Sequence, residues 1–178
     1  MAGSIADIRK NYSQKSLSEE EASTNPIQQF SKWWDEAVAS AIDEVNAMTL
    51  ATASTDGVPS ARIVLLKDFN ESGFTFFTNY NSFKGQQLAE NPKACLVFFW
   101  KELERQVRIT GLIEKLPPEA NDTYFHSRPE GSQVGAIASR QSKVIENREW
   151  LDNNYKKLAN EMKKKKIGSA RNSLFVFL

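Results

Sequence analysis

The sequence is poor in the residues that most often carry catalysis, with one cysteine, Cys95, and one histidine, His126. A single cysteine excludes an internal disulfide, and together with one histidine it cannot form a zinc site of the usual ligand spacing. Cys95 lies in an apolar run, which predicts a buried core thiol. A Ser-His-Asp or Cys-His site would have to be built around His126, and no serine is placed to favour it. We therefore expect no metal ion and no catalytic side chain.

Other common signals are also missing from the sequence. It has no G-x-G-x-x-G loop, no Walker A loop and no nucleophile elbow. No apolar stretch reaches membrane-spanning length, and the N-terminal residues lack the apolar core of a signal peptide, so the expected location is cytoplasmic, without membrane contact. The formal net charge of +1 gives no overall attraction to nucleic acid. Any anion must therefore be held by a local group of cations.

The composition is that of an ordinary folded domain. A length of 178 residues suits one domain with a real core, and 40% hydrophobic residues with 11 phenylalanines argue against disorder. Residues 1–24 are polar and read as an N-terminal arm, with one helical turn expected around Ile5 to Arg9. The remaining chain divides into a main domain, 25–166, and an atypical C-terminal tail, 167–178.

Hydrophobic periodicity predicts mainly β structure with added helices, an α+β chain. Asn25 and Pro26 supply a cap and a first residue for an amphipathic helix over 26–44. The Asp56-Gly57 turn indicates a hairpin, and the mostly hairpin-linked strands favour an antiparallel barrel or sandwich. The expected strands are 47–53, 60–67, 74–78, 94–100 and 106–114; further helices are expected over 83–91, 117–126, from 130, and over 144–164.

The end of the chain is unusual. Lys163 to Lys166 form a basic run, and Leu174 to Leu178 form an apolar terminus. An exposed apolar terminus would promote aggregation, so we expect it to pack in a sheet or at a subunit interface. The lysine run could contact nucleic acid, but a solvated helix end that complements the helix dipole is the favoured interpretation, and no nucleic-acid partner is predicted.

Cations and hydroxyls recur where the predicted strands end. Arg62 and Lys67 stand at the two ends of an apolar strand, and their odd separation places them on opposite faces of a flat strand. Thr78, Ser82 and Lys84 follow the next strand at the approach to a helix, where free backbone N–H groups favour a phosphate. A solvated surface charge is the alternative for each cation taken alone.

The same residues belong to a series of six motifs. They are Arg62-Ile63-Val64-Leu65-Leu66-Lys67, Phe76-Phe77-Thr78-Asn79, Ser82 with Lys84, Leu103-Glu104-Arg105-Gln106-Val107, Tyr124-Phe125-His126-Ser127-Arg128-Pro129 and Ser139-Arg140-Gln141-Ser142. In this order the motifs resemble those of the pyridoxamine/pyridoxine 5′-phosphate oxidases, and the resemblance covers roughly residues 5–160. The resemblance implies an antiparallel split β-barrel of the FMN-binding type, forming a homodimer with FMN at the subunit interface.

The resemblance also implies which residues bind ligands. Gln106 would approach the flavin ring from the other subunit, although the residue alone reads equally well as an exposed strand position. Tyr124, Arg128 and Ser132 recur every four residues, and with Lys67 they suit a dianionic phosphate; a packing role for Tyr124 is the alternative. The implied FMN ligands are Arg62, Ile63, Val64, Leu65, Lys67, Phe77, Thr78, Ser82, Lys84, Gln106, Gln141 and Ser142, and the implied substrate ligands are Lys67, Tyr124, Arg128, Ser132, Arg9 and Tyr12.

The implied activity is oxidation of pyridoxamine or pyridoxine 5′-phosphate to pyridoxal 5′-phosphate, with O2 as acceptor. The chain departs from the family at three places. Phe83 stands where an arginine is usual, and Phe77 where a tyrosine is common. The family's C-terminal Trp-Gly-Gly strand and Arg-x-His pair have no counterpart, so this active-site segment is missing or altered. The alternative hypothesis is a flavin- or pyridoxal-phosphate-binding protein of the same fold without turnover.

Overall fold

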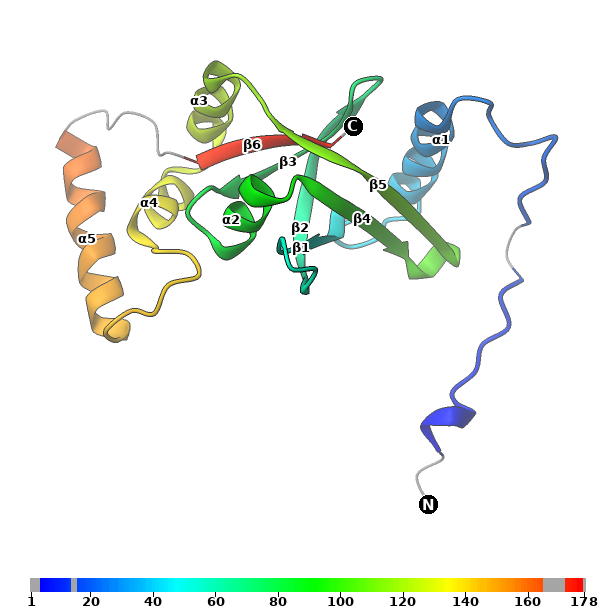
Figure 1. Ribbon diagram of the computed structural model, residues 1–178, viewed down its shortest axis with the longest axis horizontal. Coiled ribbons are helices and arrows are strands. Elements are labelled where there is room, and N and C mark those ends of the chain that lie inside the picture. Colours follow the sequence, from blue (N-terminus) through cyan, green and yellow to red (C-terminus); the bar gives the residue numbers. More distant parts are fainter. Residues whose placement is uncertain (1–3, 14–15, 165–171, 178) are drawn as a thin grey trace. The chain divides into compact units, whose positions relative to one another are not determined.

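The computed structural model describes residues 4–13, 16–164 and 172–177, with side chains described as far as residue 163 (Figure 1). These residues form two compact units. The first contains the described residues up to Val45 together with Phe98–Val107, and the second contains Asn46–Val97 together with the described residues from Arg108 onward.

The described strands form a closed barrel in the order β1-β2-β3-β6-β5-β4. All register pairs given for β1–β2, β1–β4, β2–β3, β3–β6 and β5–β6 are antiparallel. The expected class, an antiparallel barrel with added helices, is confirmed. The strands are β1 (Ala47–Ala53), β2 (Pro59–Asn70), β3 (Gly73–Asn79), β4 (Lys93–Trp100), β5 (Arg105–Lys115) and β6 (Asn172–Phe177).

Strict alternation of burial shows why β1 forms one wall of the barrel. Met48, Leu50 and Thr52 point inward and are buried, whereas the residues between them are half-buried. Register places Cys95 beside Ala51 on the outer face. The prediction that Cys95 is a core thiol is therefore wrong: it is half-buried, because Ala94 and Leu96 take the inward positions of that strand.

A β-bulge shapes the end of β2. Leu66 pairs with Phe76 and Asp68 pairs with Thr75, so Lys67 is the extra residue that has no opposite partner. The strand is longer than the predicted 60–67, since it continues through the bulge to Asn70. A bulge re-aims the side chain at the extra position, which is how Lys67 comes to line a cavity described below.

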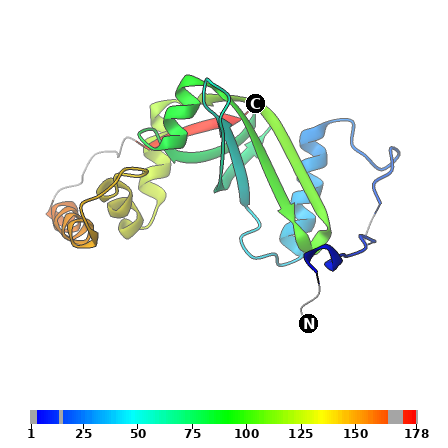
Figure 2. The same ribbon diagram turned by 60° about the horizontal axis from the view of Figure 1, so that its bottom comes forward.

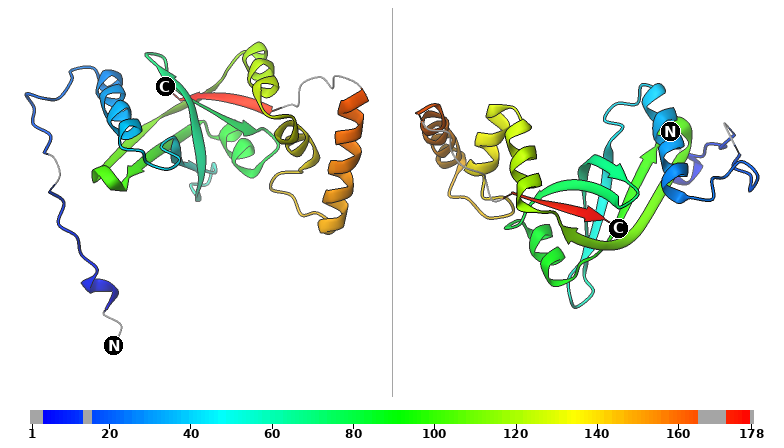
Figure 3. Two further views of the ribbon diagram at one scale, coloured as in Figure 1. Left: turned by 180° about the vertical axis from the view of Figure 1, so that it is seen from behind. Right: turned by 90° about the horizontal axis from the view of Figure 1, so that it is seen from above.

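The apolar C-terminal segment lies in the sheet, as predicted. Phe175 of β6 pairs with Phe76 of β3 on one side and with Lys115 of β5 on the other, so β6 fills a position between two strands (Figure 3). The last residue, Leu178, lies outside the described residues, as do Lys165 and Lys166 of the basic run.

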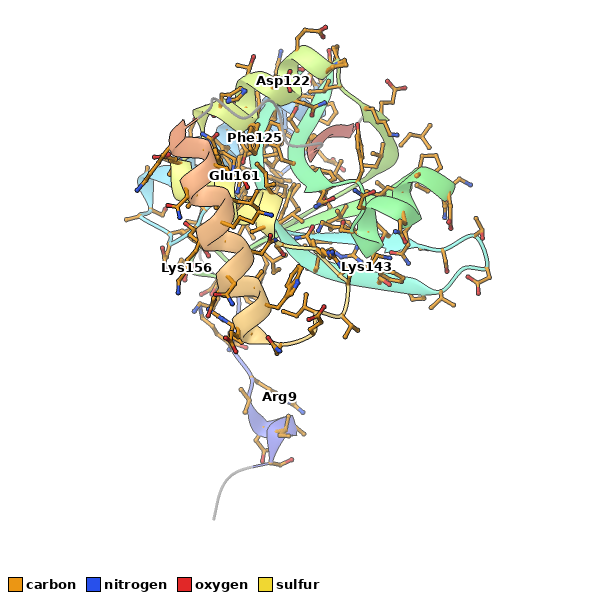
Figure 4. The ribbon with its side chains drawn as sticks, turned by 90° about the vertical axis from the view of Figure 1, so that its left-hand side faces the viewer. Arg9, Asp122, Phe125, Lys143, Lys156 and Glu161 are labelled. Carbon is orange, nitrogen blue, oxygen red and sulfur yellow. The ribbon has the colours of Figure 1, made fainter. Side chains whose placement is uncertain are left out.

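The second unit also contains four helices: α2 (Phe83–Glu90) between β3 and β4, and, between β5 and β6, α3 (Pro118–Ser127), α4 (Glu130–Ala138) and α5 (Arg148–Lys164). α5 begins four residues later than predicted, because Asn147 Oδ1 accepts a hydrogen bond from Trp150 N (2.7 Å) and caps it. α5 packs on α4, where Asn154 donates to Ala138 O at 2.9 Å (Figure 2). The side chains of Lys156 and Glu161 lie on the solvent-exposed part of α5 (Figure 4).

The first unit is built on α1 (Pro26–Ala39) and an aromatic cluster. Phe30 of α1 lies 5.2 Å from Phe98 and 5.9 Å from Trp100, measured between ring centroids. Asn25 caps the helix as predicted, but the helix ends at Ala39 rather than at 44. Left-handed φ angles at Ala41 (52°) and Glu44 (46°) explain the earlier end.

The N-terminal arm contains a single 3-10 turn, Ile5–Asp7, within the span expected to be helical. Its contacts are with Glu104, whose buried carboxylate accepts from Ser13 N at 2.8 Å and pairs with Lys10 Nζ at 2.8 Å. Among the described residues, no helix has the length and apolar character that crossing a bilayer requires.

Candidate functional site

A cavity of about 670 Å³ in the second unit gathers most of the predicted site residues. β2 and β3 provide one side, and α3, α4 and the segment after α4 provide the other. Apolar side chains and cations are mixed around it, which suits a planar organic ligand that carries a phosphate. The predicted residues that line it are Ile63, Val64, Leu65, Lys67, Phe77, Thr78, Lys84, Tyr124, Arg128, Ser132 and Gln141.

Lys84 supplies positive charge at the first turn of α2. Burial lowers the pKa of its ammonium group, and the nearby charge of Arg62 lowers this pKa further. Lys84 Nζ donates to Gln141 Oε1 at 3.3 Å, and within the described part of the chain neither Lys84 nor Arg62 forms a salt bridge. Two adjacent cations without a carboxylate favour binding of an anion, because an anion would relieve their repulsion.

Thr78, at the end of β3, carries a polar atom with no protein partner. Its side chain is 6% exposed, and no described residue hydrogen bonds to its Oγ1. Such orphaned buried hydroxyls are uncommon and costly. Because Thr78 also lines the cavity, a ligand atom is the natural partner for this hydroxyl.

Phe77 and Tyr124 form an aromatic wall of the cavity. Their rings stack with an angle of 10° between the planes. Burial raises the pKa of the Tyr124 phenol, although the charge of Arg128 acts in the opposite direction. The Tyr124 hydroxyl therefore stays protonated and can donate a hydrogen bond at neutral pH.

The structure brings Tyr124, Arg128 and Ser132 to one cavity, as their spacing predicts. α3 ends at Ser127 and α4 begins at Glu130, and the two linking residues, Arg128 and Pro129, are extended (ψ 151° and 141°). Gln133 Nε2 donates to Arg128 O at 2.8 Å and fixes this link. The bulge residue Lys67 adds a second cation from β2.

Three predicted residues of the second unit do not line this cavity. Arg62 is close enough to the lining residue Lys84 for its charge to lower the pKa of that ammonium group, but its Nη1 is directed inward and donates to Thr52 Oγ1 at 2.6 Å. Ser82 is fully buried and caps α2: its Oγ accepts from Gly85 N and donates to Asn79 O. Ser142 lies in an exposed turn with a left-handed φ of 65°, next to Gln141.

The remaining predicted residues belong to the first unit. Tyr12 and Gln106 line a separate cavity of about 990 Å³ there, together with Glu104 and Arg105. Arg9 is exposed on the arm, and its Nε donates to Ala6 O at 3.1 Å.

Sequence reasoning missed several residues that complete the cavity of the second unit. Most lie on the same face of α3 and α4 as Tyr124 and Arg128. Continuing the spacing of three or four residues across the Pro129 break would have found them. They are Asn79, Asn121, Phe125, Gly135, Ala136 and Ser139.

Comparison with known proteins identifies close relatives. The family model described as Pyridoxamine 5′-phosphate oxidase matches residues 34–160. A pyridoxine/pyridoxamine 5′-phosphate oxidase of Trichormus variabilis is 58% identical over 152 residues, which cover 85% of this chain and 71% of that protein. The corresponding protein of a Cyanothece species is 53% identical over 167 residues, covering 94% and 78% of the two chains.

Solved structures share the architecture. PhzG from Burkholderia lata, in complex with tetrahydrophenazine-1-carboxylic acid, is 25% identical with a TM-score of 0.84, over 91% of this chain and 81% of that one. A pyridoxamine 5′-phosphate oxidase-related, FMN-binding protein from Nostoc punctiforme is 14% identical with a TM-score of 0.65, over 88% and 82%. The second likeness shows the fold alone.

Proposed function

Because this chain belongs to the pyridoxamine 5′-phosphate oxidase family, we propose that it binds FMN and oxidises pyridoxamine or pyridoxine 5′-phosphate to pyridoxal 5′-phosphate with O2. The single observation that carries the proposal is the cavity of the second unit. Two of the residues that line it are Thr78, whose buried hydroxyl has no partner among the described residues, and Lys84, a cation without a neighbouring carboxylate.

The residues present fit an FMN phosphate. Lys84 and Arg62 supply charge, the Thr78 hydroxyl supplies a donor, and Gln141 already contacts Lys84. Each of these groups gains an interaction that the protein alone does not give it. Ile63, Val64 and Leu65 line the same cavity and would contact the flavin.

The substrate phosphate would be held on the opposite wall. Lys67 and Arg128 supply two cations, and Tyr124 and Ser132 supply two hydroxyls. This set suits a dianion, because charged and neutral donors can share the three terminal oxygens. Protonated Tyr124, stacked on Phe77, also helps to keep water from the ring of a bound substrate.

When bound, FMN would supply the redox chemistry, a two-electron oxidation at the 4′ carbon of the substrate with O2 as the final acceptor. The protein residues hold the substrate phosphate and so place the 4′ carbon. No protein nucleophile is needed for this reaction. Gln106 would approach the flavin from a second subunit, and the arm residues Arg9 and Tyr12 would fold over the substrate.

A homodimer is supported by the outer face of the barrel in the second unit. Register places Thr49 between Ile63 and Val97 and places Ala51 between Ala61 and Cys95. Ile63 is 65% exposed although it is a large aliphatic residue. A row of small and apolar side chains on an open sheet face favours contact with a second copy of the chain.

Visible absorption and turnover test the proposal. Purified protein supplied with FMN is expected to retain a yellow flavin spectrum after desalting. Adding pyridoxamine 5′-phosphate under air should then give equal amounts of aldehyde and hydrogen peroxide, much faster than free FMN does. Pyridoxamine without its phosphate should react poorly. Bound flavin without aldehyde would favour the non-catalytic alternative, and absence of flavin binding would contradict both.

A further inference from the structure

A chain of buried polar side chains lies behind the proposed phosphate cations. Arg62 Nη1 donates to Thr52 Oγ1 at 2.6 Å, and Thr52 Oγ1 donates to Gln87 Oε1 at 2.7 Å. Gln87 Nε2 in turn donates to Ser60 Oγ at 3.3 Å. Thr52 and Gln87 are 3% and 4% exposed. This series of hydrogen bonds therefore runs from the buried face of α2, across β1, to the guanidinium group of Arg62.

This arrangement fixes one end of the Arg62 guanidinium and leaves the other end available. Nη1 also lies 3.3 Å from Leu50 O and 3.4 Å from Ser60 O, so its donors are directed at protein acceptors. Within the described chain, no acceptor is found for Nε or Nη2. These two groups form the edge of arginine that binds a phosphate in a bidentate manner.

The direction of each hydrogen bond is set by chemistry. The Thr52 hydroxyl has one proton, and Gln87 Oε1 can only accept, so that proton goes to Gln87. The Thr52 oxygen is then oriented to accept from Arg62. Gln87 is held in turn by Ser60, which sits on the same strand as Arg62. The orientation of the guanidinium thus depends on a glutamine that does not line the cavity.

We propose that Thr52 and Gln87 are positioning residues for the anion site: they hold Arg62 so that its free edge binds the phosphate of FMN beside Lys84. The inference rests on the proposed function for the identity of the ligand. The hydrogen-bonded group of Thr52, Gln87 and Ser60, called the relay below, is an observation of the fold that does not depend on the ligand. The relay crosses from α2 to β1, which pack against each other.

Comparison of FMN with riboflavin tests the inference, because riboflavin lacks only the phosphate. Flavin-free protein would be titrated with each and followed by quenching of flavin fluorescence. Thr52→Val and Gln87→Met preserve shape and remove the relay, so each should weaken FMN binding about tenfold and leave riboflavin binding unchanged. Thr52→Ser keeps the hydroxyl and should bind FMN as the wild type does. Unchanged FMN affinity in both Thr52→Val and Gln87→Met would overturn the inference.

Two controls separate positioning from general destabilisation. Leu88→Ala removes a buried side chain of α2 outside the relay, and it should lower the melting temperature without changing the ratio of FMN to riboflavin affinity. In an Arg62→Ala background, Thr52→Val should have no further effect on FMN binding. A further tenfold loss in that background would show that Thr52 does not act through Arg62, and would overturn the inference.

Inorganic phosphate separates failure of this inference from failure of the proposed function. If the wild type binds neither flavin, the proposed function is wrong, but stabilisation by phosphate still reports on the anion site. Weaker phosphate stabilisation in Thr52→Val and Gln87→Met, with Thr52→Ser unaffected, would support the relay. Equal stabilisation in all four proteins would overturn it.

Discussion

At the residue scale, Lys84 links the anion site to pH. Burial and the charge of Arg62 hold the pKa of Lys84 in the folded protein below its ordinary value of 10.5, and a bound phosphate would raise this pKa again. FMN affinity should therefore be greatest below the pKa that Lys84 has in the FMN-free protein. As pH rises from that pKa to the higher pKa of Lys84 in the complex, the affinity should fall by up to tenfold per pH unit. Fluorescence titrations across the alkaline range measure this fall.

Lys84→Arg is the matched variant for this prediction, because arginine stays charged throughout that range. In Lys84→Arg, FMN affinity should no longer decrease as pH rises. Riboflavin affinity should not decrease with pH in either protein. The same shift has a consequence for stability: the unfolded chain binds the proton more tightly, so the contribution of Lys84 to the free energy of unfolding rises with pH between the folded pKa and 10.5. A fall in FMN affinity that persists in Lys84→Arg would assign it to another group.

Thr78 offers a second prediction, in which stability and binding respond differently. Thr78→Val removes a buried hydroxyl that no described residue satisfies, so the free energy of unfolding should stay constant or rise by up to about 1 kcal/mol. FMN binding should weaken by roughly fivefold, because the ligand loses a donor. Urea unfolding and flavin titration measure the two effects, and Thr78→Ser should retain both wild-type values. A marked loss of stability in Thr78→Val would show that the hydroxyl has a structural partner.

Ser82 shows what sequence could not predict for single residues. Its position before Lys84 is equally suitable for a phosphate ligand and for a helix cap, and the structure gives its hydroxyl two protein partners. Arg62 is also equally suitable for binding a phosphate and for binding protein acceptors. Strand alternation does not show which protein acceptors lie near its guanidinium group. By contrast, the grouping of Tyr124, Arg128 and Ser132 was predicted from their regular spacing and from the family's motifs, and it is found although two extended residues separate the helices.

At the element scale, the start of α2 depends on close backbone approach at Gly85. A Cβ built there would lie 2.5 Å from both Asn79 O and Tyr80 O, which are backbone atoms that cannot rotate away. Gly85→Ala should therefore lower the free energy of unfolding by about 2 kcal/mol and shift Lys84. Gly135→Ala is the matched control, because nothing lies within 4 Å of a Cβ in α4. It should be stabilised by about 0.5 kcal/mol. Equal unfolding midpoints for the two variants would contradict the close approach.

The arm is a second element with a defined anchor. Glu104, with a side chain 6% exposed, accepts from both Lys10 and Ser13. Hydrogen bonding to Glu104 is the main cause of the raised pKa of Lys10. Glu104→Ala should release the arm and speed tryptic cleavage after Arg9 and Lys10 several-fold, measured by mass spectrometry of the fragments. Glu102→Ala is the control, because Glu102 is exposed and, among the described residues, its salt bridge is with the neighbouring Lys101. Equal cleavage rates in the two variants would argue against the anchor.

Element positions were predicted better than element ends. Apolar and β-rich runs bounded by turn signals located all of the first five strands. Helix α1 was predicted five residues too long, since Ala41 and Ile42 continue the apolar spacing although the backbone has already turned at Ser40. The bulge at Lys67 left no signal in the sequence, because it depends on how β3 pairs beside it.

At the scale of the whole molecule, patterning predicted an antiparallel barrel or sandwich, and it predicted that the apolar terminus packs in a sheet or at a subunit interface. The choice of a barrel and the family followed from the order of the motifs. The division into an arm, a main domain over 25–166 and a tail stays a prediction. The face that would meet a second subunit was not predicted from sequence. It depends on register between strands that are distant in the chain, as in the row that joins Ile63, Thr49 and Val97.

That outer face carries the last prediction. A lysine at Val97 would place a charge in the middle of the apolar row, so Val97→Lys should convert a dimer into monomers. Size-exclusion chromatography with multi-angle light scattering should give twice the chain mass for the wild type and the chain mass for the variant. Val58→Lys is the control, because Val58 is 57% exposed in the hairpin turn away from this row. If Gln106 of a partner approaches the flavin, monomeric Val97→Lys should also lose turnover while folding normally. A wild type that is monomeric at all concentrations would refute the shared site.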